Sequence, residues 1–234
     1  RRQDLSGVLA GAGSPRWRGP SGVIVVAIDG PAGSGKSTVA DALATALGVP
    51  HVDSGAYYRA ATLAVLRAEV DPTDVDAVTA VVGRVVIDRV DGRTLLDGED
   101  VEDDIRGATV TANVSAVAAH PAVRDLLLVA QRSGIARDGG VVDGRDAATR
   151  IVPDADLKVW LDADVEERGR RRALQAGEPE RLDHHIADLH RRDAADATQM
   201  VRADDAVVVN TTGRSLDHVV ATVADLARTA AGGS

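Results

Sequence analysis

The spacing of apolar residues divides the chain into short apolar runs and longer helical stretches. Residues 23–29 read VIVVAID, a continuous β-branched run that is typical of a strand buried on both faces of a parallel sheet. Residues 36–47 carry apolar side chains at helical spacing, and Gly48 is suited to end that helix. Residues 51–53 predict a second short strand. The pattern therefore opens as strand, helix and strand.

The same alternation continues along the rest of the chain. An Asp91-Gly92 pair between two apolar runs predicts a hairpin within residues 85–101, and Trp160 lies in an apolar run that we expect in the core. The remaining pattern predicts strands at 141–143, 157–161 and 206–209, and helices at 54–67, 71–82, 109–119, 123–135, 165–192 (broken near Gly177 and Pro179) and 215–228. Strands that alternate with helices predict an α/β three-layer fold with a central parallel sheet, on which the hairpin region is an inserted lobe.

The glycine-rich loop between the first strand and the first helix reads GPAGSGKS and matches G-x-x-x-x-G-K-[ST] in full. Glycines allow positive φ, so successive N–H groups can point inward, and the helix that follows adds its own free N–H groups. A chance match in an ordinary glycine turn is the alternative, but the position between strand and helix argues against it. We predict that the phosphates of a nucleoside triphosphate bind to Gly30, Gly33, Ser34, Gly35, Lys36, Ser37 and Thr38, with Mg²⁺ on the hydroxyl of Ser37.

Phosphate binding alone does not separate a kinase from a GTPase or a motor ATPase. A GTPase needs a later N-K-x-D type guanine reader, and the chain has only two lysines, Lys36 and Lys158, neither of which lies in such a motif. A motor ATPase normally needs a longer chain or partner subunits. The small size and the many arginines that follow the loop favour a kinase for a small molecule.

The composition limits the core that the chain can build and the classes of partner that it can bind. The chain has 234 residues, 44% hydrophobic and only 2% aromatic, so we expect one domain with a core of Val, Leu, Ile and Ala. A net charge of -9 argues against a sequence-independent nucleic-acid binder, so an anionic substrate would need a local arginine cluster. Cysteine is absent, which fits a reducing cytoplasm, and no apolar run is long enough to span a membrane. We expect residues 1–22 to be a disordered leader, an expression remnant or a misassigned start.

Further segments carry a resemblance to a known family. DSGAYYR follows the second predicted strand, GRD follows the third, and VPDADLKVWL leads into the arginine-rich EERGRRR; Arg192-Asp193 and Asp196 come later. In this order and at these spacings the set resembles the bacterial cytidylate kinase family over about residues 23–226. The resemblance implies a P-loop nucleoside monophosphate kinase that uses ATP with Mg²⁺ to phosphorylate CMP and dCMP, acting as a cytoplasmic monomer on small molecules, with no nucleic acid or membrane partner.

The resemblance also implies a division of labour among residues. It implies a core of residues 23–58, 136–164 and 204–230, within a domain of 23–230, an NMP-binding insert at about 59–135 and a short helical lid at about 165–203. It places Ser54, Tyr58, Arg59, Ser115, Arg124, Arg145, Asp146, Arg192 and Asp196 around CMP. Asp146 and Arg124 would read the cytosine edge, with Ser115 near the amine. Catalytic roles would fall to Lys36, Arg145, Arg192 and Asp143, and the lid would bring Arg168 and Arg172 over ATP.

Elementary chemistry agrees with these roles. Phosphoryl transfer requires aligned phosphates and neutralised charge, and the planar fork of arginine suits both. The carboxylate of Asp146 can accept a hydrogen bond from the cytosine amino group, whereas a uracil carbonyl has no hydrogen to donate. Asp143 could either contact magnesium through water or serve as a structural hydrogen-bond acceptor. Of Arg170, Arg171 and Arg172, at least one should be solvated or paired with Glu166 or Glu167.

Several positions depart from the family pattern. Gln199 stands where an arginine is usual, unless Arg202 moves in to replace that charge, and the lid around residues 176–179 is short. Ala148 and Arg150 replace residues common after GRD, and Asn210 replaces an aspartate. These departures leave two alternatives open: a kinase for another small acceptor, and a nucleotide-binding protein of weak catalytic activity.

Overall fold

The computed structural model describes residues 23–135 and 139–232, so the expected leader at 1–22 lies outside the described residues. Within them, a five-stranded sheet has the order β2-β6-β1-β7-β8 and every pairing in it is parallel. Its strands are β1 (Val25–Asp29), β2 (His51–Asp53), β6 (Gly140–Gly144), β7 (Leu157–Asp162) and β8 (Val207–Asn210). The predicted central parallel sheet is therefore confirmed. Because the strands are parallel, the loops that follow them meet at one edge of the sheet.

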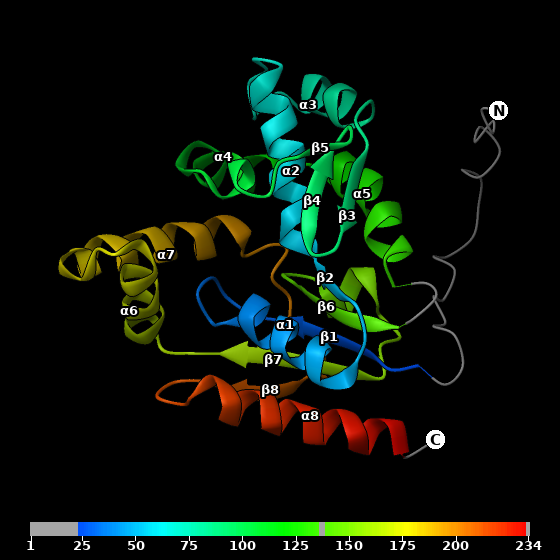
Figure 1. Ribbon diagram of the computed structural model, residues 1–234. Helices are drawn as coiled ribbons and strands as arrows, with labels where there is room; N and C mark the ends of the chain where they lie inside the picture. The colour runs from blue at the N-terminus through cyan, green and yellow to red at the C-terminus, as the bar shows by residue number, and fades with distance from the viewer. Residues whose placement is uncertain (1–22, 136–138, 233–234) are drawn as a thin grey trace.

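Helices cover both faces of this sheet (Figure 1). Helices α1 (Lys36–Leu47) and α8 (Leu216–Gly232) pack on one face, over apolar side chains such as Ile28 and Val159. The other face carries α2 (Ser54–Arg67), α5 (Pro121–Ser133) and a π-helical turn, η2 (Ala147–Ile151), over Ala27 and Val142. The three layers follow from the sequence, since β1 and β6 are buried along their whole length.

Two local features differ from the predictions. Trp160, which we expected in the core, is only half-buried, because alternate side chains of β7 point to a face that the second helix layer leaves partly open. The helix predicted at 123–135 is confirmed as α5, and Pro121 forms its first turn, where the missing N–H costs no hydrogen bond. The turn η2 was not predicted, because a single π-turn has no period in the sequence.

The inserted lobe lies between α2 and α5. It contains α3 (Val75–Val82), the antiparallel strands β3 (Ile87–Val90), β4 (Arg93–Leu96) and β5 (Glu99–Asp100), the turn η1 (Asp104–Arg106) and α4 (Ala108–Ala118). Asp91 and Gly92 join β3 to β4 with positive φ of 50° and 78°, which confirms the predicted hairpin. Figure 1 shows this lobe above the sheet, with α2 running from the sheet into it.

A helical hairpin forms the predicted lid region. It consists of α6 (Val165–Ala176), the turn η3 (Pro179–Arg181) and α7 (Leu182–Asp196), which lie side by side beyond the end of β7 in Figure 1. Gly177 ends α6 with φ of 70°. Within the described part of the chain, no helix has the length and apolar content that crossing a bilayer would require.

Candidate active site

The glycine-rich loop joins β1 to α1. Gly30, Gly33 and Gly35 have φ of 149°, 76° and 93°, a range that L side chains rarely adopt. A Cβ atom on Gly30 would lie 2.1 Å from the carbonyl oxygen of Leu161, so packing as well as backbone conformation requires glycine there. No side chain caps the first turn of α1. The free N–H groups of that turn are therefore available to an anion.

Lys36 is held inside this loop. Its Nζ donates to the carbonyl oxygen of Pro31 at 2.7 Å. Burial, and next the positive charge of Arg145, lower the pKa of Lys36 to about 7. A bound phosphate would supply the negative charge that favours the protonated amine.

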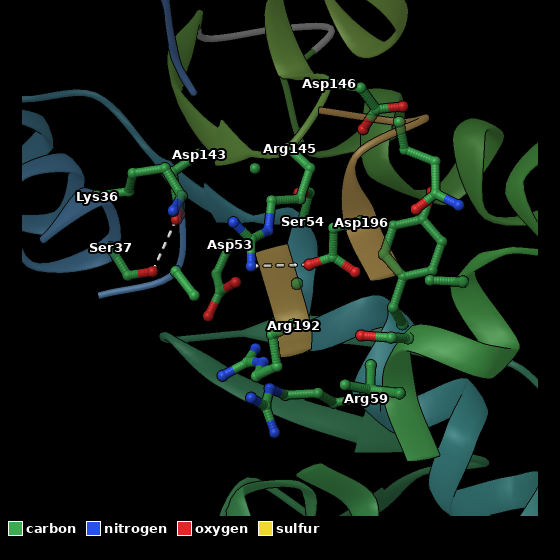
Figure 2. A pocket seen from close by; sticks show the side chains of 18 of the residues that line it. Lys36, Ser37, Asp53, Ser54, Arg59, Asp143, Arg145, Asp146, Arg192 and Asp196 are labelled. Carbon is green, nitrogen blue, oxygen red and sulfur yellow. Dashed lines mark hydrogen bonds and ion pairs between the residues drawn. The ribbon is translucent and has the colours of Figure 1, made fainter. Parts of the chain in front are cut away.

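Ser37 and Asp143 provide two oxygens beside the loop. The Ser37 hydroxyl donates to Asp143 Oδ2 at 2.7 Å, as drawn in Figure 2, and His51 Nε2 lies 2.7 Å from Asp143 Oδ1. Both oxygens are hard ligands of the kind that Mg²⁺ accepts. Among the described residues, no group of three or more His, Cys, Asp or Glu side chains is placed to hold a metal ion. This donor set fits a magnesium ion that keeps several waters and is held largely by substrate phosphates.

A cavity opens next to Lys36, and we call it the CMP cavity after the ligand predicted for it. The nine residues predicted around CMP all line it, together with Ser37 and Asp143: Ser54, Tyr58, Arg59, Ser115, Arg124, Arg145, Asp146, Arg192 and Asp196. They come from α2, α4, α5, the end of β6 and α7, so folding brings together positions far apart in sequence. Their individual roles stay predictions.

Several arginines line this cavity, among them Arg59, Arg145 and Arg192 (Figure 2). Arg59 donates to Thr111 Oγ1 at 2.9 Å, and Arg145 pairs with Asp196 at 2.8 Å. Burial, followed by the charges of Arg192 and Arg106, lowers the pKa of Arg59 to about 10. The Nε of Arg192 is buried and meets no hydrogen-bond acceptor among the described residues. This surplus of positive charge suits an anionic ligand.

The far end of the cavity is suited to a base. Arg124 forms an ion pair with Asp146, and its guanidinium lies 5.8 Å from the ring centroid of Tyr58. Burial raises the pKa of Asp146, while Arg124 opposes that shift. An aromatic ring beside a paired carboxylate and guanidinium offers stacking together with both donor and acceptor groups.

Asp29 holds the backbone of the turn that follows Asp146. Sequence reasoning did not single out Asp29 as a site residue. Its two carboxylate oxygens each accept a backbone N–H at 2.8 Å, from Ala147 and Ala148. Burial raises the pKa of Asp29 to about 6. Ala148 therefore contributes to this turn through its backbone N–H. Arg150, whose side chain is 33% exposed, pairs with Asp125 and does not line the CMP cavity. These two departures from the family pattern leave the cavity intact.

The lid arginines divide into different environments. Arg168 is buried and donates to Ala32 O at 2.8 Å and to Asp193 at 2.6 Å, so it joins the phosphate loop to α7. Arg172 lines both the CMP cavity and the neighbouring cavity around the phosphate loop. Arg170 and Arg171 both pair with Glu167, which confirms that at least one of the three consecutive arginines is paired.

The position of the missing arginine is also visible. Gln199 lines the CMP cavity, whereas Arg202 is exposed and lines neither that cavity nor the one around the phosphate loop. Sequence reasoning missed Asp53 and Arg106, which line the CMP cavity as an ion pair of 3.0 Å. Asp53 opens the DSG motif after a strand and could have been proposed. Arg106 had no local signal, because it lies in a short turn after the hairpin.

A phosphate-binding loop on a parallel sheet, with a second anion-suited cavity beside its lysine, defines the class of P-loop phosphotransferases. The family model described as cytidylate kinase matches residues 26–229. A cytidylate kinase of Mycobacterium avium is 47% identical over 217 residues, covering 88% of this chain and 95% of its own. One of Rhodococcus opacus is 46% identical over 84% of this chain and 91% of its own, and one of Geobacter sulfurreducens is 43% identical over 84% and 89%. The chain belongs to the cytidylate kinase family.

Proposed function

We propose that this protein transfers the terminal phosphoryl group of ATP to CMP and dCMP, forming ADP and CDP or dCDP with the help of Mg²⁺. The observation that carries the proposal is that the phosphate loop and the arginine-rich cavity meet at Lys36, which lines both. Membership of a kinase family supports ATP as the donor. That the chain acts as a cytoplasmic monomer is a further proposal, which rests on the sequence resemblance.

Each part of the reaction has residues in this site that are suited to it. The loop amides and Lys36 would hold the β- and γ-phosphates, and Ser37 and Asp143 would hold Mg²⁺, which neutralises charge on the phosphates when bound. Arg59, Arg145 and Arg192 would hold the CMP phosphate in line with the donor. Residues 59–135 would act as the NMP-binding insert and 165–203 as the lid. Such a site accelerates transfer mainly by alignment and by charge neutralisation.

Substrate selection is the direct test. We would measure ADP release from ATP and Mg²⁺ with CMP, dCMP, UMP, AMP and GMP offered separately. Turnover confined to CMP and dCMP supports the proposal. Turnover with another monophosphate would show that the acceptor is a different nucleotide. ATP binding without turnover would show that the protein binds nucleotides but does not act as a kinase on these acceptors.

Base recognition gives a sharper prediction. Asp146→Ala removes the acceptor for the cytosine amino group and leaves Arg124 buried without its partner. We therefore expect the CMP-over-UMP ratio of kcat/KM to fall about 10-fold to 100-fold, since an unpaired buried polar group costs roughly 1–3 kcal/mol. The ATP KM should change less than threefold.

Asp125→Ala is the matched control. Asp125, on α5, forms a similar ion pair with Arg150 of η2, but it is 73% exposed and does not line the cavity. It should leave selectivity unchanged. An Asp146→Ala variant with undiminished preference for CMP would contradict the assignment of Asp146 as a base reader.

A further inference from the structure

Arg106 lies where the two cavities meet. It ends the turn η1, directly before α4, and it lines the CMP cavity with Arg59 and Arg192. It also lines the cavity around the phosphate loop, which holds the loop residues and Arg172. A phosphoryl group that passes from donor to acceptor has to cross the space between these two cavities.

Two carboxylates orient the Arg106 guanidinium. Its Nη2 donates to Asp53 Oδ2 at 3.0 Å and to Glu102 Oε1 at 2.8 Å, and its Nε lies 3.2 Å from the same Glu102 oxygen. Asp53 is itself fixed, because its other oxygen caps α2 by accepting from Ala56 N at 3.0 Å. Among the hydrogen bonds within the described residues, Nη1 of Arg106 takes part in none, so that nitrogen can donate to a ligand.

The charge of Arg106 reaches both sides of the site. Burial is the largest cause that lowers the pKa values of Arg59 and Arg172, and the nearby positive charge of Arg106 contributes to both shifts. Arg59 comes from the acceptor side and Arg172 from the lid. Arg106 therefore belongs to the same positive field as the groups assigned to either phosphate.

At one position of the site, residue 199, this chain lacks the arginine that is usual in the family pattern. Gln199 lines the CMP cavity with a neutral amide, and Arg202, the sequence candidate to replace the missing arginine, is exposed and lines neither cavity. Arg106 is 49% exposed at its side chain, so a ligand can reach it without unfolding the lobe.

We propose that Arg106 is a catalytic residue that donates from Nη1 to the phosphoryl group during its transfer, in place of the charge that Gln199 lacks. This rests on the proposed function. The bond between the γ-phosphorus and the ADP oxygen breaks, and a bond forms between that phosphorus and an oxygen of the CMP phosphate. Arg106 stays protonated and exchanges no proton. It stabilises charge on the moving phosphoryl oxygens, while Asp53 and Glu102 keep its plane in position.

The test compares Arg106→Ala with the unmodified protein, after turnover with ATP and CMP has been established for the latter. We expect kcat to fall about 10²-fold to 10³-fold, the usual effect of losing one donor to a transition state. The dissociation constants of ATP and CMP should change less than threefold. Binding of ADP, aluminium fluoride and CMP together, which imitates the transferring phosphoryl group, should weaken by a factor similar to the fall in kcat. Added guanidinium should restore part of the turnover.

Arg67→Ala is the matched control. Arg67 lies in the same lobe and pairs with Glu99 and Asp104, but it does not line either cavity. It should keep kcat and analogue binding within about twofold.

Three results would overturn the proposal: unchanged turnover in Arg106→Ala, equal losses in Arg106→Ala and Arg67→Ala, or a loss of ATP and CMP affinity as large as the loss of kcat. The last would mean that Arg106 only neutralises Asp53. If the unmodified protein binds ATP and CMP but transfers nothing, the proposed function fails, and the catalytic role of Arg106 fails with it.

Discussion

Some charged side chains in this site are largely buried but have few hydrogen-bond or ion-pair partners. Lys36 donates to a single backbone carbonyl, and the Nε of Arg192 meets no acceptor among the described residues. Removing charges from water is costly unless an opposite charge replaces the water. Negative charge on a bound phosphate would therefore stabilise these groups, which would couple binding to protonation.

The protonation of Lys36 gives a pH prediction. In the free protein its pKa lies at about 7, so near pH 8 most molecules carry a neutral amine. Triphosphate favours the charged amine and raises this pKa, so binding near pH 8 should take up close to one proton, and affinity should fall as pH rises above about 7. Calorimetry of ATP binding in two buffers with different ionisation enthalpies measures the uptake.

Lys36→Met is the reference for that experiment, because it removes the titrating amine and should abolish the buffer-dependent part of the heat. Equal apparent heats in both buffers for the unmodified protein at pH 8 would show that Lys36 is already charged before ATP binds.

At the scale of elements, the hairpin of α6 and α7, which we predict to be the lid, depends on a close contact between its two helices. A Cβ atom on Gly169, in the middle of α6, would lie 2.5 Å from Cγ1 of Ile186 on α7. Glycine is normally unfavourable inside a helix by about 1 kcal/mol relative to alanine. Its presence here lets the two lid helices approach, and Arg168, next to it, reaches the phosphate loop from the same helix.

Gly169→Ala should therefore destabilise the protein in spite of the better helix propensity. We expect the free energy of unfolding in urea to fall by about 1–3 kcal/mol, since overpacking displaces Ile186. Adding Ile186→Ala removes the clashing atom, so the double variant should lose less than the sum of its single variants. Gly177→Ala, where a Cβ would meet nothing within 4 Å, tests strain from positive φ without a clash. Strict additivity would mean that α6 and α7 are not in contact at Gly169 in solution.

At the scale of the whole molecule, the site exists only where three parts meet. The central sheet and the helices that cover it supply Lys36, Arg124 and Asp146, the inserted lobe supplies Arg106, and α7 supplies Arg192. Ligands that bridge the parts should stabilise their relative placement as well as the fold. A ligand present at 100 times its dissociation constant adds about 2.7 kcal/mol to the stability of a folded protein.

A bisubstrate ligand that joins adenosine and cytidine through phosphates should slow amide hydrogen exchange in α4, α6 and α7, and leave α8 unaffected. The physical reason is that closure of insert and lid buries the moving segments around the ligand. ATP alone should protect the phosphate loop and α6 but not α4. Protection confined to the phosphate loop with the bisubstrate ligand would contradict closure.

Local patterns accounted for a large part of the fold and the donor side of the site. The parallel strands, the Asp91-Gly92 hairpin and the phosphate loop are each encoded by neighbouring residues, so the sequence predicts them directly. The resemblance to the cytidylate kinase family added the acceptor residues, which the fold places in one cavity. The prediction that Trp160 lies in the core was wrong, because the burial of a side chain on β7 depends on which helices cover that face of the sheet.

By itself, the sequence determined the strand, loop and helix that we propose hold triphosphate, since the order of strand, glycine-rich loop and helix and the position of Lys36 are set by contiguous residues. It also determined the family. Only the tertiary structure decided which groups act together. Asp29 accepts a hydrogen bond from the backbone of Ala148, and Arg106 donates one to Asp53. Gln199 lines the CMP cavity, whereas Arg202 does not. Contacts between distant segments, and the pKa shifts that follow from burial, arise from packing, and no short stretch of sequence contains them.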